Sequence, residues 1–205
     1  MTSAGVRQDG AVNWTRAVHH LTTLATTCDD MAGRPASIFP LRVGGLWAAG
    51  GLLGRPRELE TITVALTVDV AAVPWLTEPA GARHWASAAR LPQTPAEVHW
   101  RSAHAPVWNH RLERPVLVWS AADGVNDEAL AAIADGEAEP LRLPAPAADE
   151  LATRLSDELA LSLRALRDRT GEYEERRWKP GKLEPVSDAL WQASAGYLDL
   201  LDVIK

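Results

Sequence analysis

The chain has 205 residues, enough for one ordinary domain with a sizeable core, and its apolar and charged shares exclude a disordered or fibrous protein. Its formal net charge of −6 argues against nucleic acid as a partner, because binding a phosphate backbone requires an excess of lysine and arginine. The single cysteine, Cys28, excludes an intrachain disulfide. Neither a signal peptide nor a membrane-length apolar run is evident, so we expect a cytoplasmic protein that does not enter a membrane.

Helical and extended patterns alternate through the first 146 residues, which predicts a small mixed α/β sheet flanked by helices. Apolar residues recur every three or four positions after Asn13, a residue suited to cap a helix. The segment 59–70 is rich in Thr, Val and Ile, as is typical of a buried central strand. In chain order we predict a helix over 14–31, a strand and tight turn over 41–53, the strand 59–70, short helices over 84–90 and 94–101, strands over 107–111 and 115–120, a helix over 127–134 capped by Asn126, and an extended piece over 140–143.

The C-terminal part has a different character. Pro144 and Pro146 mark a boundary, and leucines spaced three or four residues apart after it predict a long amphipathic helix. Pro180 and Gly181 break this helix, and a second helical pattern follows. Two such helices pack as an antiparallel hairpin, because neither can bury its apolar stripe alone. We therefore expect a frayed tail over 1–12, an α/β core over 13–146, and a helical hairpin over 147–205 packed on that core.

One constellation of residues supports a sharper hypothesis. The apolar segment 46–51 ends in Gly50 and Gly51 and leads through a turn to Glu58 and Glu60 at the start of the next predicted strand. This arrangement resembles the minimal nucleotidyltransferase superfamily, in which a strand ends in Gly-Ser and an Asp-x-Asp motif opens the next strand. The resemblance implies that Gly50 and Gly51 would cradle a phosphate, and that Glu58 and Glu60 would face the same side and hold Mg²⁺.

The chain departs from this superfamily at the positions that carry its chemistry. Gly51 stands where the superfamily has serine, and Glu58 and Glu60 replace the two aspartates with side chains one methylene longer. No third carboxylate is obvious, since the later strand 116–119 is purely apolar. Mg²⁺ demands close octahedral geometry, so an incomplete ligand set should bind it poorly. We therefore expect a degenerate, nucleotidyltransferase-like domain without a cofactor or metal.

Three functions follow from these expectations. The leading one is a non-catalytic protein that acts by binding, either to a protein partner or to further copies of itself. The first alternative is an active nucleotidyltransferase that uses Mg²⁺ held by Glu58 and Glu60. The second alternative is a small-molecule binding module built from a polar segment whose side chains are able to orient a ligand. The candidate ligand-binding residues of that segment are His99, Arg101, His104, Asn109 and His110.

The chain as a whole is also similar to an uncharacterised family of actinobacterial proteins of comparable length. The similarity rests on residues 14–20, 46–70, 108–110, 173–178 and 180–183. It implies no known activity. The nine tryptophans are spread along the whole chain, so we expect them to serve mainly as core anchors and not as a stacking platform for bases.

Overall fold

The computed structural model describes residues 11–204, so most of the predicted tail, 1–12, lies outside the described residues. The helices are α1 (Trp14–Ala32), α2 (Ala82–Ala88), α3 (Asp127–Asp135), α4 (Ala148–Arg176) and α5 (Glu184–Ile204). The strands are β1 (Val43–Ala49), β2 (Ile62–Val68), β3 (Ala96–Ser102), β4 (Val116–Ser120) and β5 (Gly124–Val125). Short 3₁₀ turns are η1 (Gly50–Leu53), η2 (Leu91–Gln93) and η3 (Glu139–Leu141).

The five strands form one mixed sheet in the order β3-β2-β1-β4-β5. The strand β1 runs antiparallel to both β2 and β4, whereas β2 and β3 run parallel. The fold is therefore a mixed α+β arrangement with a C-terminal helical pair, as the sequence predicts. This order buries β2 and β1 in the middle of the sheet and leaves β3 at one edge.

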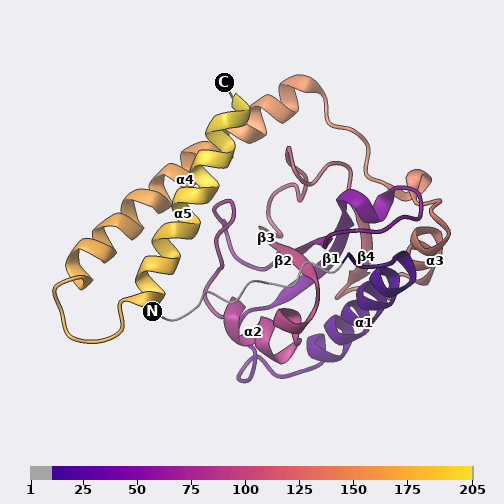
Figure 1. Ribbon diagram of the computed structural model, residues 1–205, viewed down its shortest axis with the longest axis horizontal. Helices are drawn as coiled ribbons and strands as arrows, with labels where there is room; N and C mark the ends of the chain where they lie inside the picture. The colour runs from indigo at the N-terminus through magenta and orange to yellow at the C-terminus, as the bar shows by residue number, and fades with distance from the viewer. Residues whose placement is uncertain (1–10, 205) are drawn as a thin grey trace.

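One face of the sheet is covered by an apolar core that includes α1, α2 and α3 (Figure 1). The helix α1 begins where expected, because the Asn13 side chain accepts a hydrogen bond from the Arg16 amide at 2.8 Å. Its apolar stripe is fully buried at Leu21 and Ala25. Cys28 lies on the same stripe, and burial raises the pKa of its thiol, so it behaves as a small hydrophobe.

The helices α4 and α5 lie side by side as a long pair that projects beyond the sheet (Figure 1). They contact the remaining structure through a smaller apolar cluster that includes Trp75, Leu155 and Leu200. Gly196 of α5 packs directly on the backbone carbonyl of Trp75, and a methyl group at this position would overlap that carbonyl. No helix among residues 11–204 is both long and apolar enough to span a bilayer.

Two predicted elements are wrong. The segment 94–101, predicted as a helix, instead forms β3, because parallel pairing with β2 over its whole length overrides its local preference. The segment 107–111, predicted as a strand, is a turn. There the Asn109 side-chain oxygen accepts hydrogen bonds from the amides of Arg111 and Leu112, both at 3.0 Å, and this bends the chain.

Two further differences concern the ends of predicted segments. The piece 140–143, predicted as extended, begins in the 3₁₀ turn η3. Val12, placed by us in the frayed tail, is only 5% exposed and forms an antiparallel bridge with Leu59. This bridge occupies the stretch just before β2, so the regular strand begins at Ile62 and not at Leu59.

Candidate binding site

The two glutamates of the nucleotidyltransferase hypothesis precede β2 and are exposed on the surface. Leu59, the residue between them, is buried through its bridge to Val12. Within residues 11–204 no group of three or more His, Cys, Asp or Glu side chains lies close enough to hold a metal ion. Glu58 and Glu60 therefore have no third acidic or histidine ligand among the described residues.

The glycine turn of the same hypothesis is present. Gly50 adopts a φ of 61°, which favours glycine, and it opens the 3₁₀ turn η1 directly after β1. Gly51 contacts the Leu59 side chain so closely that a methyl group there would collide with it. The group that packs closely against the Gly51 backbone is thus the apolar side chain of Leu59.

Four of the five polar residues predicted between 99 and 110 do converge, on the sheet face opposite α1. The fifth, His104, does not join them. Its imidazole Nε2 lies 2.9 Å from the Asp69 carboxylate on the surface, and both side chains are more than half exposed. His104 is therefore separate from the other four.

A buried ion pair joins β3 to α4. The Arg101 guanidinium, with its side chain 2% exposed, donates to the Glu158 carboxylate, whose side chain is 4% exposed. Arg154 donates to the same carboxylate at 2.9 Å, and the Asn109 amide donates to its other oxygen at 3.1 Å. Arg101 also donates to the Val107 carbonyl at 3.0 Å. Glu158 is thus fully enclosed by donors from three segments, which fixes α4 on the sheet.

A second polar centre joins α5 to the same region through Asp199. Its carboxylate accepts hydrogen bonds from the Trp75 indole at 2.7 Å and from Arg111, and it lies 2.8 Å from Nε2 of His110. Burial opposes ionisation of Asp199, but the hydrogen bonds from Arg111, Trp75 and His110 outweigh it and lower its pKa to about 2. The carboxylate is therefore charged at neutral pH.

Trp75 connects the two polar centres. Its indole stacks on the His99 ring with a centroid separation of 4.8 Å and an interplanar angle of 7°. The Arg101 guanidinium lies 5.3 Å from the centroid of the same indole, and the His110 ring meets it edge-on. Arg101, Asn109 and His110 thus dock the hairpin on the sheet through contacts within the chain. The Nδ1 atoms of His99 and His110 are buried without a hydrogen-bond partner among the described residues.

Three residues that complete this network, Trp75, Glu158 and Asp199, are not among those predicted from the sequence. A signal for two of them is present in the sequence. Glu158 comes one residue before Leu159 of the leucine pattern, and Asp199 comes between Leu198 and Leu200, so each is an acidic residue beside apolar helical positions, where an unpaired charge would be costly to bury. Trp75 lies in a loop and carries no periodic signal.

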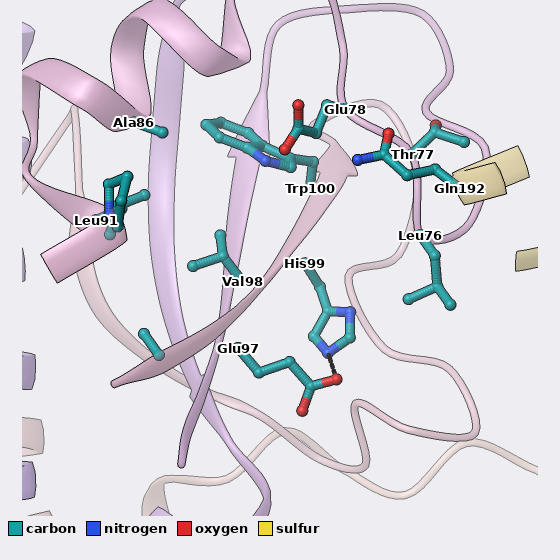
Figure 2. Close-up of a pocket in the computed structure, with 12 residues that line it drawn as sticks. Leu76, Thr77, Glu78, Ala86, Leu91, Glu97, Val98, His99, Trp100 and Gln192 are labelled. Carbon is teal, nitrogen blue, oxygen red and sulfur yellow. Dashed lines mark ion pairs between the residues drawn. The ribbon is translucent and has the colours of Figure 1, made fainter. Parts of the chain in front are cut away.

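A cavity of about 300 Å³ opens beside this network at the outer edge of β3. We call it the β3 groove, and its polar and aromatic lining comes from Thr77, Glu78, Glu97, His99, Trp100 and Gln192. Figure 2 shows Trp100 and His99 on opposite sides of β3, with Glu97 directed at His99. The Glu97 carboxylate lies 3.4 Å from Nε2 of His99, and this hydrogen bond lowers the pKa of Glu97 despite partial burial. The groove lining contains no lysine or arginine.

These features define a mixed α+β domain whose C-terminal helical pair is held on one sheet face by buried polar contacts and borders an acidic groove. The chain belongs to the family described as Domain of unknown function (DUF7711), whose model matches residues 12–205. The match runs through both the sheet and the hairpin, so the two parts together make up the family's domain. No curated protein and no solved structure gives a significant match.

Proposed function

We propose that this domain is a non-catalytic binding protein that recognises a protein partner through the β3 groove and the adjoining face of α5. The observation that carries the proposal is Trp191 of α5, a large apolar side chain that is 71% exposed. It directly precedes Gln192, a groove residue, and lies one helical turn from Asp188, which faces Arg83 of α2 at 3.8 Å.

The exposed apolar surface continues along α5. Leu198 is 55% exposed and lies seven residues after Trp191, so the two share one face of the helix. Tryptophan dominates binding energy at protein interfaces because it removes a large apolar area from water when covered. Large exposed apolar side chains beside a groove are typical of a contact surface.

The proposed function is non-catalytic because of how the candidate catalytic groups are arranged. Glu58 and Glu60 are exposed and have no third metal-binding partner within the described part of the chain. Arg101, Asn109 and His110, which are able to orient a substrate, are directed at Glu158 and Asp199 instead. Binding therefore suits the described surface better than catalysis does.

The proposal is tested by placing a photo-crosslinking residue, p-benzoylphenylalanine, at position 191 in cells that express the protein. Trp178 provides a matched control site, because it is an even more exposed tryptophan, at 80%, which lies in the connection between α4 and α5 and does not line the groove. We expect a discrete crosslinked product from position 191 and none of that size from position 178. A product of twice the chain's mass would identify a second copy, and any other mass a different protein. Equal, diffuse labelling at both positions would contradict the proposal.

The active-enzyme alternative makes the opposite prediction for nucleotide binding. Calorimetric titration of the domain with Mg²⁺ and nucleoside triphosphates should show no binding if the acidic pair is degenerate. Micromolar affinity that disappears in both Glu58→Ala and Glu60→Ala would instead support a metal-dependent nucleotidyltransferase and overturn the non-catalytic proposal.

A further inference from the structure

We infer that the β3 groove binds an extended peptide segment with a basic side chain, which adds to the free edge of β3 as a further strand. This inference rests on the proposed function and names the chemistry of the partner. Three features carry it: the hydrogen-bonding groups at the strand edge, the charge of the groove, and the different character of its two sides.

The first feature is the register of β3. In a parallel ladder, alternate residues of a strand direct both their amide and their carbonyl to the neighbouring strand, and the residues between direct theirs away. The amide of Ala103, just after β3, donates to the Val68 carbonyl at the end of β2 at 2.8 Å. Ala103 therefore directs its backbone groups to β2, and so do Arg101, His99 and Glu97, which precede it in steps of two. Val98 and Trp100 lie between these residues and direct their backbone groups away from β2.

Val98 and Trp100 are also residues that line the groove. Within residues 11–204 no backbone or side-chain group forms a hydrogen bond with their outward amides and carbonyls. Two residues of an edge strand thus offer two donors and two acceptors to the groove. An extended peptide satisfies such a set by strand addition, because its own groups repeat with the same spacing.

The second feature is the charge of the groove. Glu78 and Glu97 line it, whereas no lysine or arginine does. Glu78 forms an ion pair with Arg83 at 3.0 Å, but the Arg83 side chain is 58% exposed, so this pair is weak. The hydrogen bond from His99, helped by the nearby charge of Arg111, lowers the pKa of Glu97 and favours its charged form, and the Glu97 side chain is 49% exposed. A basic side chain that reaches Glu97 therefore meets an accessible carboxylate.

The third feature is the contrast between the two sides of β3. Glu97 and His99 project to one side, whereas Trp100 projects to the other, toward the side where Ala86 and Leu91 lie (Figure 2). Successive side chains of an added strand point alternately to these two sides. The groove therefore favours a peptide in which a basic residue is flanked by apolar ones.

The inference is tested with the purified full-length domain and three synthetic libraries of seven-residue peptides. The central residue is fixed as lysine in the first library, as norleucine in the second and as glutamate in the third. We expect the lysine library to bind about fivefold more tightly than the norleucine library, which corresponds to one partly exposed ion pair, and the glutamate library to bind most weakly. Equal binding of all three libraries, or binding of none, would overturn the inference.

Two variants test separately the contribution of the β3 backbone edge and that of the Glu97 charge to peptide binding. Val98→Pro removes an outward amide without touching the ladder to β2, so the domain should fold and lose peptide binding. Glu97→Gln should leave binding in place but reduce the fivefold preference for lysine. As a measurement that does not depend on folding of a variant, N-methylation of the peptide backbone should weaken binding at alternate positions only. A uniform effect of N-methylation would contradict strand addition.

Failure of this inference is distinguishable from failure of the proposed function. If position 191 crosslinks to a protein in cells while no library binds, the partner docks on α5 without entering the groove as a strand. If neither is observed, both the proposed function and the inference are wrong.

Discussion

The two faces of the sheet are held by different kinds of contact. The face covered by α1 and α3 is apolar, with residues such as Leu66 and Ile133 fully buried among other hydrophobic side chains. The opposite face carries a smaller apolar cluster and docks the hairpin through two ion pairs, the buried pair of Arg101 with Glu158 and the pair of Arg111 with Asp199, in which Arg111 is more than half exposed. Apolar contacts are non-directional, whereas charged hydrogen bonds require fixed positions.

This difference indicates that the two faces of the sheet have different roles. The apolar face provides stability that does not depend on pH, since its buried residues do not titrate in the physiological range. The polar face sets the position of α4 and α5, and with it the shape of the β3 groove and the location of Trp191. Disturbing the polar face should therefore change the position of α5 beside the groove, whereas disturbing the apolar face away from the groove should mainly change stability.

The largest expected effect is on the ion pair between β3 and α4. Glu158→Ala leaves Arg101 buried without its carboxylate and should reduce the free energy of unfolding by about 3–5 kcal/mol. The double replacement Arg101→Met with Glu158→Leu should cost less than Glu158→Ala alone, because it removes both charges. Urea denaturation measures both. If the double variant were the less stable of the two, the ion pair would itself be the source of stability.

The contact between α5 and the loop of Trp75 gives the next largest effect. Gly196→Ala places a methyl group against the Trp75 carbonyl and should destabilise the protein by about 1–3 kcal/mol. Gly171→Ala is the matched control, because this glycine also lies inside a helix but has no neighbour near the added methyl group. It should stabilise the protein by about 0.5–1 kcal/mol through helix propensity. Thermal unfolding distinguishes the two, and equal effects would contradict the close packing at Gly196.

A smaller effect is expected from pH. The pKa of Asp199 is lowered to about 2 in the folded protein, below its ordinary value of about 3.9, so this carboxylate stabilises the fold above that ordinary value. The stabilisation should be lost as the pH falls from about 4 toward 2, because the unfolded chain takes up the proton first. Urea midpoints across this range should fall less steeply in Asp199→Asn than in the original protein. Identical slopes would show that Asp199 is not held in its charged form by the fold.

The smallest expected effect tests the register of β3. Glu97→Pro removes an amide that bonds to β2, whereas Val98→Pro removes one that faces the groove. Glu97→Pro should therefore be the less stable variant by about 0.5–1.5 kcal/mol, the worth of one backbone hydrogen bond. Chemical denaturation of the pair provides the measurement. If Val98→Pro were the less stable variant, the amide of Val98 and not that of Glu97 would bond to β2.

The sequence predicts best the elements whose pattern is local. The capped helix α1 and the two C-terminal helices follow from apolar periodicity and from Asn13, Pro180 and Gly181, and the structure confirms them. The strand β3 was not predictable in this way, because it exists through pairing with β2 about thirty residues earlier. Long-range pairing leaves little mark on the local sequence.

Of the candidate site, only residues that lie close together in the sequence were predicted, because contacts between distant segments leave no local pattern. His99, Arg101, Asn109 and His110 were expected to lie together and do so, although as docking contacts. Their partners Glu158 and Asp199 come from helices about fifty or more residues later in the chain, and only the tertiary fold brings them close. The β3 groove depends on the edge position of β3, which no local pattern reveals.

The most direct test of this account is amide hydrogen exchange along β3, followed by NMR in the free domain. The account predicts an alternating profile, with the amides of Glu97, His99 and Arg101 protected by their bonds to β2 and the amide of Val98 exchanging much faster. Addition of a binding peptide with a central lysine should then protect Val98. Strong protection of Val98 in the free domain would show that the edge of β3 is already occupied, and would contradict the account.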